Sequence, residues 1–341
     1  MSVLPEADVI SFARGIPSPD LLPIDALAEC ASRALRADGR VALNYGPIAG
    51  YGPLREWLAA RHGVAVERVV VTPGSLLGLN IVTELLTHAG ATPIVEAPTY
   101  DRMLHSLEAL GADIATVKRQ PQGLDLDGLD ALLRNGPRRR FLYVLPTFHN
   151  PTGLTLSPEQ RIELVELAIE RELIVYEDDA YGLLRIDGEP APTLGSLLRE
   201  RGADHLALFS SSFSKTVAPG LRIGYLLLPE HMAASFAALA TRMYVSPPLA
   251  PQAELFEFVR SGLFDEHLHW LRDALRTRRD AMLDVLAVEP LLHAVEIVRE
   301  VHARLLLDLQ RHRRELRAQL AVRTLPRGDE HGGGVQAAGE R

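Results

Sequence analysis

Apolar residues along this chain gather in short runs, and each run is bounded by polar or turn-forming residues. Between the runs lie longer stretches in which apolar residues recur at helical spacing, such as residues 76–86 and 101–110. Short apolar strands that alternate with helices are typical of a mostly parallel sheet with both faces covered. We therefore predict an α/β fold with a seven-stranded sheet flanked by helices, whose strands fall at residues 69–71, 93–96, 114–117, 141–145, 173–176, 206–209 and 223–228.

The regions around these strands predict how the chain is divided. Residues 1–40 are expected to form an N-terminal arm with a short helix, and residues 41–288 a large domain that includes an interdomain helix. Residues 289–326 are predicted to be an atypical helical segment, because residues 291–323 contain neither Gly nor Pro. Residues 327–341 have few apolar side chains and many glycines, a composition that predicts a disordered tail.

Composition narrows the class of protein without naming a reaction. With 341 residues the chain can form one large or two moderate domains, and its 36 basic and 44 acidic side chains give a net charge of −8. That balance argues against non-specific binding to nucleic acid or to an anionic membrane. Cys30 is the only cysteine, so neither a disulfide framework nor a thiolate metal cluster is expected. With no secretory leader or membrane span in view, we expect a cytoplasmic enzyme without a metal.

The most informative stretch runs from residue 210 to residue 222 and places Lys215 in a serine-rich turn. A lysine can form a Schiff base with an aldehyde, which would anchor a carbonyl cofactor. Ser212, Ser214 and Arg222 are the groups that a phosphate monoester requires, because hydroxyls and a guanidinium fork bond its oxygens. Aldehyde and phosphate together describe pyridoxal 5′-phosphate (PLP). A solvated basic loop is the alternative interpretation of this stretch.

Four further motifs follow other predicted strands, where ligands bind in such sheets. Ser75 starts a helix whose amides could hold a phosphate, and Tyr100 could lie on the face of a pyridine ring. The amide of Asn150, fixed between prolines, could donate to a phenolate oxygen, and Tyr181 could bond the same oxygen. Asp178 could keep a pyridine nitrogen protonated and so make the ring an electron sink.

Three of these motifs have a plainer alternative. The turn before Ser75 could be purely structural, Tyr100 could pack under a loop, and the acidic strand end could face solvent. Asp178 and Asp179 cannot both face a ring, and Asp178 is chosen from its position in the motif. His149 is interpreted as a packing or loop residue. The glycine-rich loop at residues 44–52, which presents two tyrosines, could contact a ligand or form a simple turn.

Taken in order, seven motifs resemble the class I/II aminotransferases of PLP fold type I. Within that family the chain is similar to the 2-aminoadipate aminotransferase-like group, which also forms the aminotransferase-like domain of MocR regulators. The resemblance implies an α/β fold of PLP fold type I and covers residues 10 to 288. Its motifs are residues 11–20, 45–55, 72–75, 98–100, 149–153, 177–181 and 212–222.

The resemblance also implies a role for each residue around the ring. Lys215 would form the internal aldimine and carry the proton between the substrate Cα and the cofactor. Asp178 would pair with the pyridine nitrogen, Asn150 and Tyr181 would bond the ring oxygen, and Tyr100 would stack on the ring. Lys215, Asp178 and Tyr181 are therefore the expected catalytic residues.

The resemblance implies a separate set of contacts for the phosphate. Ser75, Ser212, Ser214 and Arg222 would hold the phosphate, together with the backbone amide of Leu76.

Tyr45 resembles the residue that reaches the phosphate of a neighbouring subunit, which implies a homodimer with shared active sites. Gly15 lies where the arm approaches the substrate in this family, and Arg14 stands where a small residue is usual. Gly15, Arg14 and Asn150 are therefore the expected contacts of an amino acid or 2-oxo acid substrate.

The resemblance ends at about residue 288. Members of the family finish in a small α+β domain that carries an arginine for the substrate α-carboxylate, whereas residues 289–326 predict only helix, and so a reduced or atypical small domain. Three interpretations stay open: an aminotransferase that binds the carboxylate otherwise, a PLP-dependent lyase or decarboxylase, and a truncated PLP-binding module without catalysis. A PLP-sensing module like that of MocR regulators is a related non-catalytic alternative. The leading hypothesis is a PLP-dependent aminotransferase.

Overall fold

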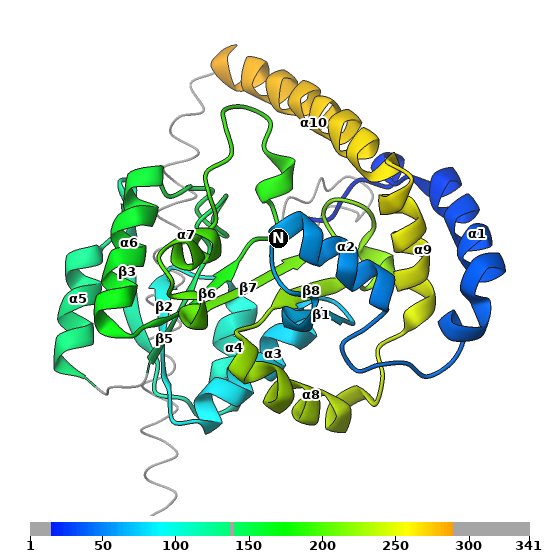
Figure 1. Cartoon of the computed structure of the whole chain (residues 1–341). Helices are drawn as coiled ribbons and strands as arrows, with labels where there is room; N and C mark the ends of the chain where they lie inside the picture. The colour runs from blue at the N-terminus through cyan, green and yellow to red at the C-terminus, as the bar shows by residue number, and fades with distance from the viewer. Residues whose placement is uncertain (1–14, 137–139, 289–341) are drawn as a thin grey trace, which may run out of the picture. The chain divides into compact units, whose positions relative to one another are not determined.

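The computed structural model describes residues 15–136 and 140–288 of the chain. Two compact units divide the chain, residues 1–276 and residues 277–341. The first unit is built on one eight-stranded sheet with the strand order β1-β8-β7-β6-β5-β2-β3-β4 (Figure 1). The strands are β1 (Val69–Thr72), β2 (Thr92–Ala97), β3 (Ala115–Gln120), β4 (Gly123–Leu124), β5 (Arg140–Val144), β6 (Ile174–Asp178), β7 (Ala207–Ser212) and β8 (Gly224–Leu227).

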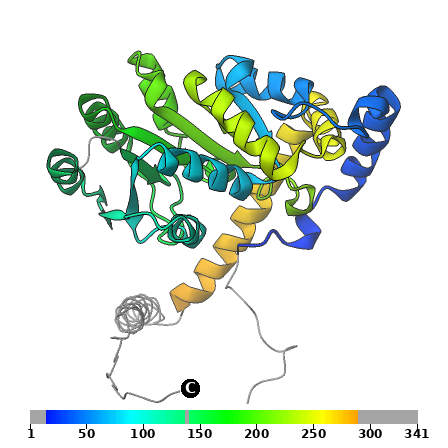
Figure 2. The same cartoon turned by 90° about the horizontal axis from the view of Figure 1, so that it is seen from below.

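Helices lie on both sides of this sheet, as the two views in Figures 1 and 2 show. Helices α3, α4 and α8 pack on one face around residues such as Leu79 and Phe236. On the other face α5, α6 and α7 pack around Leu164, and α1, α2 and α9 pack near β1 and β8 around Leu54. The helices are α1 (Ile24–Ala42), α2 (Gly52–His62), α3 (Ser75–His88), α4 (Asp101–Ala109), α5 (Leu126–Asn135), α6 (Pro158–Arg171), α7 (Leu194–Glu200), α8 (Glu230–Tyr244), α9 (Leu249–Arg260) and α10 (Leu263–Val288).

The prediction of a mostly parallel α/β sheet is confirmed, with one strand more than expected. Parallel pairing joins β3, β2, β5, β6 and β7, whereas β8 runs antiparallel to both β7 and β1. The eighth strand is β4, which has two residues and forms a tight hairpin with the end of β3. A two-residue strand carries no periodic pattern of apolar residues, so the sequence does not reveal it.

Burial on both faces explains why the strands are apolar throughout rather than alternating. Val69, Val70 and Val71 are all buried, and Val70 belongs to a different core cluster from the other two. Successive side chains of a strand point to opposite faces, so a strand between two helix layers needs apolar residues at every position.

Several predictions fall outside the described residues. They concern Arg14 in the arm, the atypical segment at residues 289–326 and the tail at residues 327–341. Among the helices that the structure does describe, none is both long and apolar enough to cross a membrane.

Candidate active site

The predicted site residues follow the carboxyl ends of the parallel strands. Asp178 is the last residue of β6, Ser212 is the last residue of β7, and Lys215 lies in the turn after it. Tyr100 directly precedes α4 beyond the end of β2, and Asn150 lies in the loop after β5. Parallel strands end at the same edge of a sheet, so residues far apart in the sequence meet there.

Asp178 is a buried carboxylate held by two hydroxyl groups. The Tyr143 hydroxyl donates to its Oδ2 at 2.6 Å, and the Ser210 hydroxyl donates to its Oδ1 at 2.9 Å. Burial raises the pKa of Asp178 to about 6, while the hydrogen bonds from Tyr143 and Ser210 act in the opposite direction. Among the described residues no lysine or arginine forms an ion pair with Asp178. This carboxylate therefore lacks a cation of its own.

Two tyrosines lie close enough to Asp178 to feel its charge. The pKa of Tyr100 is raised first by burial and then by the negative charge of Asp178. The pKa of Tyr181 is raised by the same two causes in the same order. Both phenols therefore stay protonated and can donate a hydrogen bond near the carboxylate.

Asp179 has a different role from its neighbour. Its Oδ1 accepts the backbone N–H groups of Tyr181 at 3.2 Å and Gly182 at 2.6 Å. These bonds fix the turn that carries Tyr181 after β6. The structure thus separates the two aspartates, one with its carboxylate beside the tyrosines and one that stabilises a turn.

The predicted phosphate-binding residues converge where α3 begins. We call this group the cradle; it consists of the beginning of α3 with Gly74 and Ser75, together with Ser212, Ser214 and Arg222. Gly74 precedes α3 with φ 86°, and a Cβ atom there would overlap the guanidinium of Arg222. A Cβ atom at Gly224 would overlap the backbone of Ser75, and Gly224 is the register partner of Ser212.

Two serines complete this cradle on the side of β7. The Ser212 hydroxyl donates to the Ser214 hydroxyl at 2.9 Å and accepts the backbone N–H of Ser214 at 3.1 Å. The helix start, the serine hydroxyls and Arg222 thus lie close together, and groups of these kinds can bind an anion. Leu76, the second residue of α3, lies at the same helix end and is exposed.

Lys215 is half-buried beside this cradle, and its ammonium group donates to the carbonyl oxygen of Gly15. Burial lowers the pKa of Lys215 from its usual value. A larger fraction of the amine is therefore neutral, which makes it a better nucleophile and proton acceptor. The contact brings Gly15, a residue of the predicted N-terminal arm, to the lysine.

Asn150 is held by a buried polar cluster that sequence reasoning missed. Its neighbour His149 lies with Nδ1 2.9 Å from the Thr152 hydroxyl and Nε2 3.3 Å from the carboxylate of Glu96. Glu96 also accepts from Arg119 at 2.7 Å. These contacts fix the loop and leave the side chain of Asn150 without a hydrogen bond to any described residue, so its amide is available to a ligand.

Tyr143 and Ser210 are also site residues that the sequence did not indicate as such. Tyr143 lies within the apolar run at residues 141–145, where a tyrosine resembles an ordinary core residue. Only the register of the sheet, in which Asp178 lies opposite Ser210, brings these hydroxyls to the carboxylate. Tyr45, in contrast, is 84% exposed in the single chain.

Comparison with known proteins agrees with this geometry. The family model described as aminotransferase class I and II matches residues 7–327. A 2-aminoadipate transaminase from Thermus thermophilus is 36% identical over 82% of this chain and 69% of its own length. An aromatic-amino-acid aminotransferase from Thermococcus litoralis is 29% identical over 84% of this chain and 70% of its own length. A probable rhizopine catabolism regulatory protein, MocR, from Rhizobium meliloti is 28% identical over 78% of this chain and 53% of its own length.

Solved structures lead to the same family. The crystal structure of the α-aminoadipate aminotransferase LysN from Thermus thermophilus, complexed with N-(5′-phosphopyridoxyl)-L-leucine, superposes with a TM-score of 0.76. It shares 35% sequence identity over 82% of this chain and 71% of its own. The chain belongs to the class I and II aminotransferase family, and it is a PLP-dependent aminotransferase. The predictions of fold type, cofactor and aminotransferase activity are thereby confirmed.

The described residues fit PLP on two physical grounds. The guanidinium of Arg222 lies against Gly74, at the beginning of α3, only because no Cβ atom is present there. Asp178 is a buried carboxylate without a cation among the described residues, and the protonated ring nitrogen of PLP is a cation. Ser75, Ser212, Ser214 and Arg222 would hold the phosphate.

The first testable prediction concerns the hydroxyl that holds Asp178. In Tyr143→Phe the pKa of Asp178 should rise above about 6, because a hydrogen bond to the charged form is lost. The protonated acid cannot pair with a pyridinium nitrogen, so PLP binding should weaken at a higher pH than in the wild type. One such bond corresponds to about one pH unit. The dissociation constant of PLP, measured from pH 5 to pH 9, would show this as a loss of affinity that begins at a higher pH when the pH is lowered.

Tyr176→Phe is the matched control for this prediction. Tyr176 is equally buried and packs edge-on against Tyr143 at 5.4 Å, but its hydroxyl is not bonded to Asp178. Its pH profile should match that of the wild type. Identical profiles for all three proteins would show that the Tyr143 hydroxyl does not control the carboxylate.

Proposed function

We propose that this chain transfers an amino group between an α-amino acid and a 2-oxo acid at the edge of the sheet where β6 and β7 end, with Lys215 as its reactive amine. The observation that supports this best is the convergence of three groups from separate parts of the chain. They are the half-buried Lys215, the buried carboxylate of Asp178 and the cradle formed around Gly74. An aldehyde, a ring nitrogen and a phosphate are the three groups that such a site can hold at once.

The roles of the residues follow from their contacts. Bound PLP supplies an aldehyde that reacts with amines and a pyridine ring that accepts the electron pair of a broken Cα–H bond. Asp178 remains ionised above pH 6 and can hold the ring nitrogen protonated. Tyr181 and Asn150 can donate to the ring oxygen, and Tyr100 can cover the ring. The Nζ atom of Lys215, with its lowered pKa, can take the proton from the substrate Cα and return it.

Substrate contacts belong to the N-terminal arm in this proposal. The carbonyl of Gly15 already lies at the Lys215 ammonium, so this residue of the predicted arm is beside the reactive amine. We propose Arg14, which precedes it, and Asn150 as further contacts of the substrate. The names of two relatives suggest 2-aminoadipate and aromatic amino acids as the first donors to test.

Two further expectations also stay predictions. They are the division into an arm, a large domain and an atypical C-terminal segment, and a cytoplasmic location.

A homodimer with shared active sites is supported by an exposed apolar surface next to Tyr45. Leu43 is 73% exposed and Val245 is 64% exposed, although both are large apolar residues. A hydrogen bond of 3.0 Å from the Gly46 amide to the Ser246 hydroxyl joins their two segments. Contiguous exposed apolar side chains mark interaction sites, and a second copy of the chain could cover this one and receive Tyr45 at its phosphate.

The second testable prediction concerns the reactive lysine. The chain contains only two lysines, Lys118 and Lys215. Lys118 lies exposed on β3, away from the cradle, and therefore provides a matched control. Lys215→Ala should lose amino transfer by a factor of about a thousand or more, because the group that moves the proton is gone. Lys118→Ala should keep the wild-type rate.

Reduction with borohydride provides a readout that does not depend on turnover. When the PLP-loaded protein is reduced and digested, the phosphopyridoxyl group should be found on the peptide that contains Lys215 and not on the peptide that contains Lys118. Labelling of Lys118, or full transaminase activity of Lys215→Ala, would contradict the proposed role.

The third testable prediction concerns Tyr45 and the homodimer. Tyr45→Phe removes a hydroxyl that is exposed in the single chain, so an isolated subunit should bind PLP unchanged. In a dimer with shared sites the same change should weaken PLP binding by about tenfold, because one hydrogen bond to a charged phosphate is lost. The PLP dissociation constant measures the effect of Tyr45→Phe on binding, and sedimentation equilibrium measures whether the protein is a dimer.

Tyr51→Phe is the control from the same glycine-rich loop. The Tyr51 hydroxyl donates to Asp38 at 2.9 Å within its own chain, so PLP affinity should not change. A monomer at micromolar concentration, or equal PLP affinity of Tyr45→Phe and the wild type, would rule out a shared site.

A further inference from the structure

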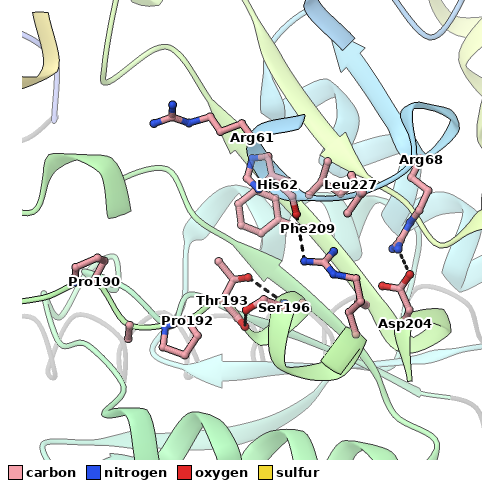
Figure 3. Close-up of a pocket in the computed structure, with 15 residues that line it drawn as sticks. Arg61, His62, Arg68, Pro190, Pro192, Thr193, Ser196, Asp204, Phe209 and Leu227 are labelled. Carbon is pink, nitrogen blue, oxygen red and sulfur yellow. Dashed lines mark hydrogen bonds and ion pairs between the residues drawn. The ribbon is translucent and has the colours of Figure 1, made fainter. Parts of the chain in front are cut away.

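A cavity of about 490 Å³ lies on the face of the sheet that carries α7, away from the cofactor site (Figure 3). The end of α2, the loop at residues 190–193 and helix α7 form its walls, and side chains of β7 and β8 form its floor. Its volume falls within the range of small-molecule sites.

The cavity shares no residue with the proposed phosphate cradle. Its floor on β7 consists of Ala207 and Phe209, whereas the cradle begins at Ser212 at the other end of that strand. Phe209 and Ser212 are three positions apart on an extended strand, which corresponds to about 10 Å. A ligand in the cavity would therefore not occupy the position of PLP.

Three arginines line the cavity, and two of them have carboxylate partners. Arg68 donates from Nε to the Leu228 carbonyl at 2.7 Å and pairs with Asp204. Arg61 lies 3.5 Å from Asp265 and its guanidinium is directed away from the cavity in Figure 3.

Arg199 is the cation without a carboxylate. Among the described residues its one hydrogen bond runs from Nη2 to the carbonyl oxygen of His62 at 3.2 Å. Its remaining guanidinium N–H groups can bond an anion bidentately.

The positive charge of Arg199 acts on the groups around it. Burial first, and then the charges of Arg61 and Arg199, lower the pKa of His62 to about 4. The pKa of Arg68 is lowered first by burial and then by Arg199. His62 is therefore neutral at physiological pH, and the charge that faces the cavity comes from Arg199. Such a field favours an anionic ligand.

Apolar surface makes up the rest of the floor and one wall. Phe209 and Leu227 belong to the core of the sheet, and Pro190 and Pro192 stand in the loop opposite them. Figure 3 shows the two prolines across the cavity from Phe209 and Leu227. Apolar walls with a few placed polar groups are typical of sites that bind small organic molecules.

We propose that this cavity is a second binding site, for a small organic carboxylate with an apolar body. The carboxylate binds the guanidinium of Arg199, and the apolar body lies between Phe209 and Leu227 on one side and the loop at residues 190–193 on the other.

The experiment uses 3-phenylpropionate as the probe and the PLP-loaded full chain as the protein, with binding measured by isothermal titration calorimetry. Arg199→Gln should weaken binding by about tenfold or more, because the charged hydrogen bonds are lost. Arg201→Gln is the matched control, since Arg201 directly follows the same helix, bonds the Leu197 carbonyl at 3.2 Å and does not line the cavity. Its affinity should equal that of the wild type.

A second variant keeps the test decisive if Arg199→Gln is unstable. Ala191→Trp adds a ring from the loop wall without removing any of the hydrogen bonds described above, and it should also weaken binding. The neutral analogue 3-phenylpropanol and the small anions acetate and inorganic phosphate should each bind more weakly than 3-phenylpropionate.

Three outcomes would overturn the proposal. They are equal affinity of Arg199→Gln and the wild type, phosphate binding as tight as that of 3-phenylpropionate, and no binding to the wild type at millimolar concentration. A change in the absorption band of bound PLP that persists in both variants would place the probe in the cofactor site instead, and so contradict the second site.

Discussion

The buried carboxylate of Asp178 is the constraint on which the site depends. Taking an ionised carboxylate out of water costs several kcal/mol, and two hydroxyl donors offset only part of that cost. Tyr143 and Ser210 supply those donors, yet the pKa of Asp178 still rises to about 6. Among the described residues no basic side chain pairs with it, so a bound cation can stabilise it. A protonated ring nitrogen is such a cation, and we propose that the surrounding residues hold the ring that carries it.

Sheet topology explains how one short edge collects these groups. Strands β2, β5, β6 and β7 run parallel, so the residues that follow them meet at one edge. Strand β8 runs the other way, and its first residue, Gly224, therefore starts at that same edge against Ser75. The reversal brings Arg222, which lies just before β8, to the beginning of α3. Parallel order gathers Tyr100, Asn150 and Asp178 at this edge, and the reversed strand β8 between β7 and β1 brings Arg222 to the beginning of α3.

The sequence predicts the parts of this arrangement that depend on local pattern. Apolar runs predict the main strands, and the motif around Lys215 predicts the cofactor, because both signals lie within a few consecutive residues. The two-residue β4 has no such signal, and Tyr143 resembles any other core residue of its strand. The cavity near Arg199 was also beyond prediction, since residues 61–68 and 190–209 meet only in the folded chain. What sequence pattern cannot supply is the register that brings distant strands together.

The most direct test of the central claim compares the unfolding free energy of the wild type and Asp178→Asn with and without PLP at pH 8. The carboxylate of Asp178 is charged in the folded protein above about pH 6. Because its pKa is raised on folding, this charge lowers the free energy of unfolding in the absence of PLP. Without PLP, Asp178→Asn should be at least as stable as the wild type, whereas PLP should stabilise the wild type far more than the variant. Equal stabilisation of both proteins by PLP would contradict the claim that Asp178 pairs with the cofactor.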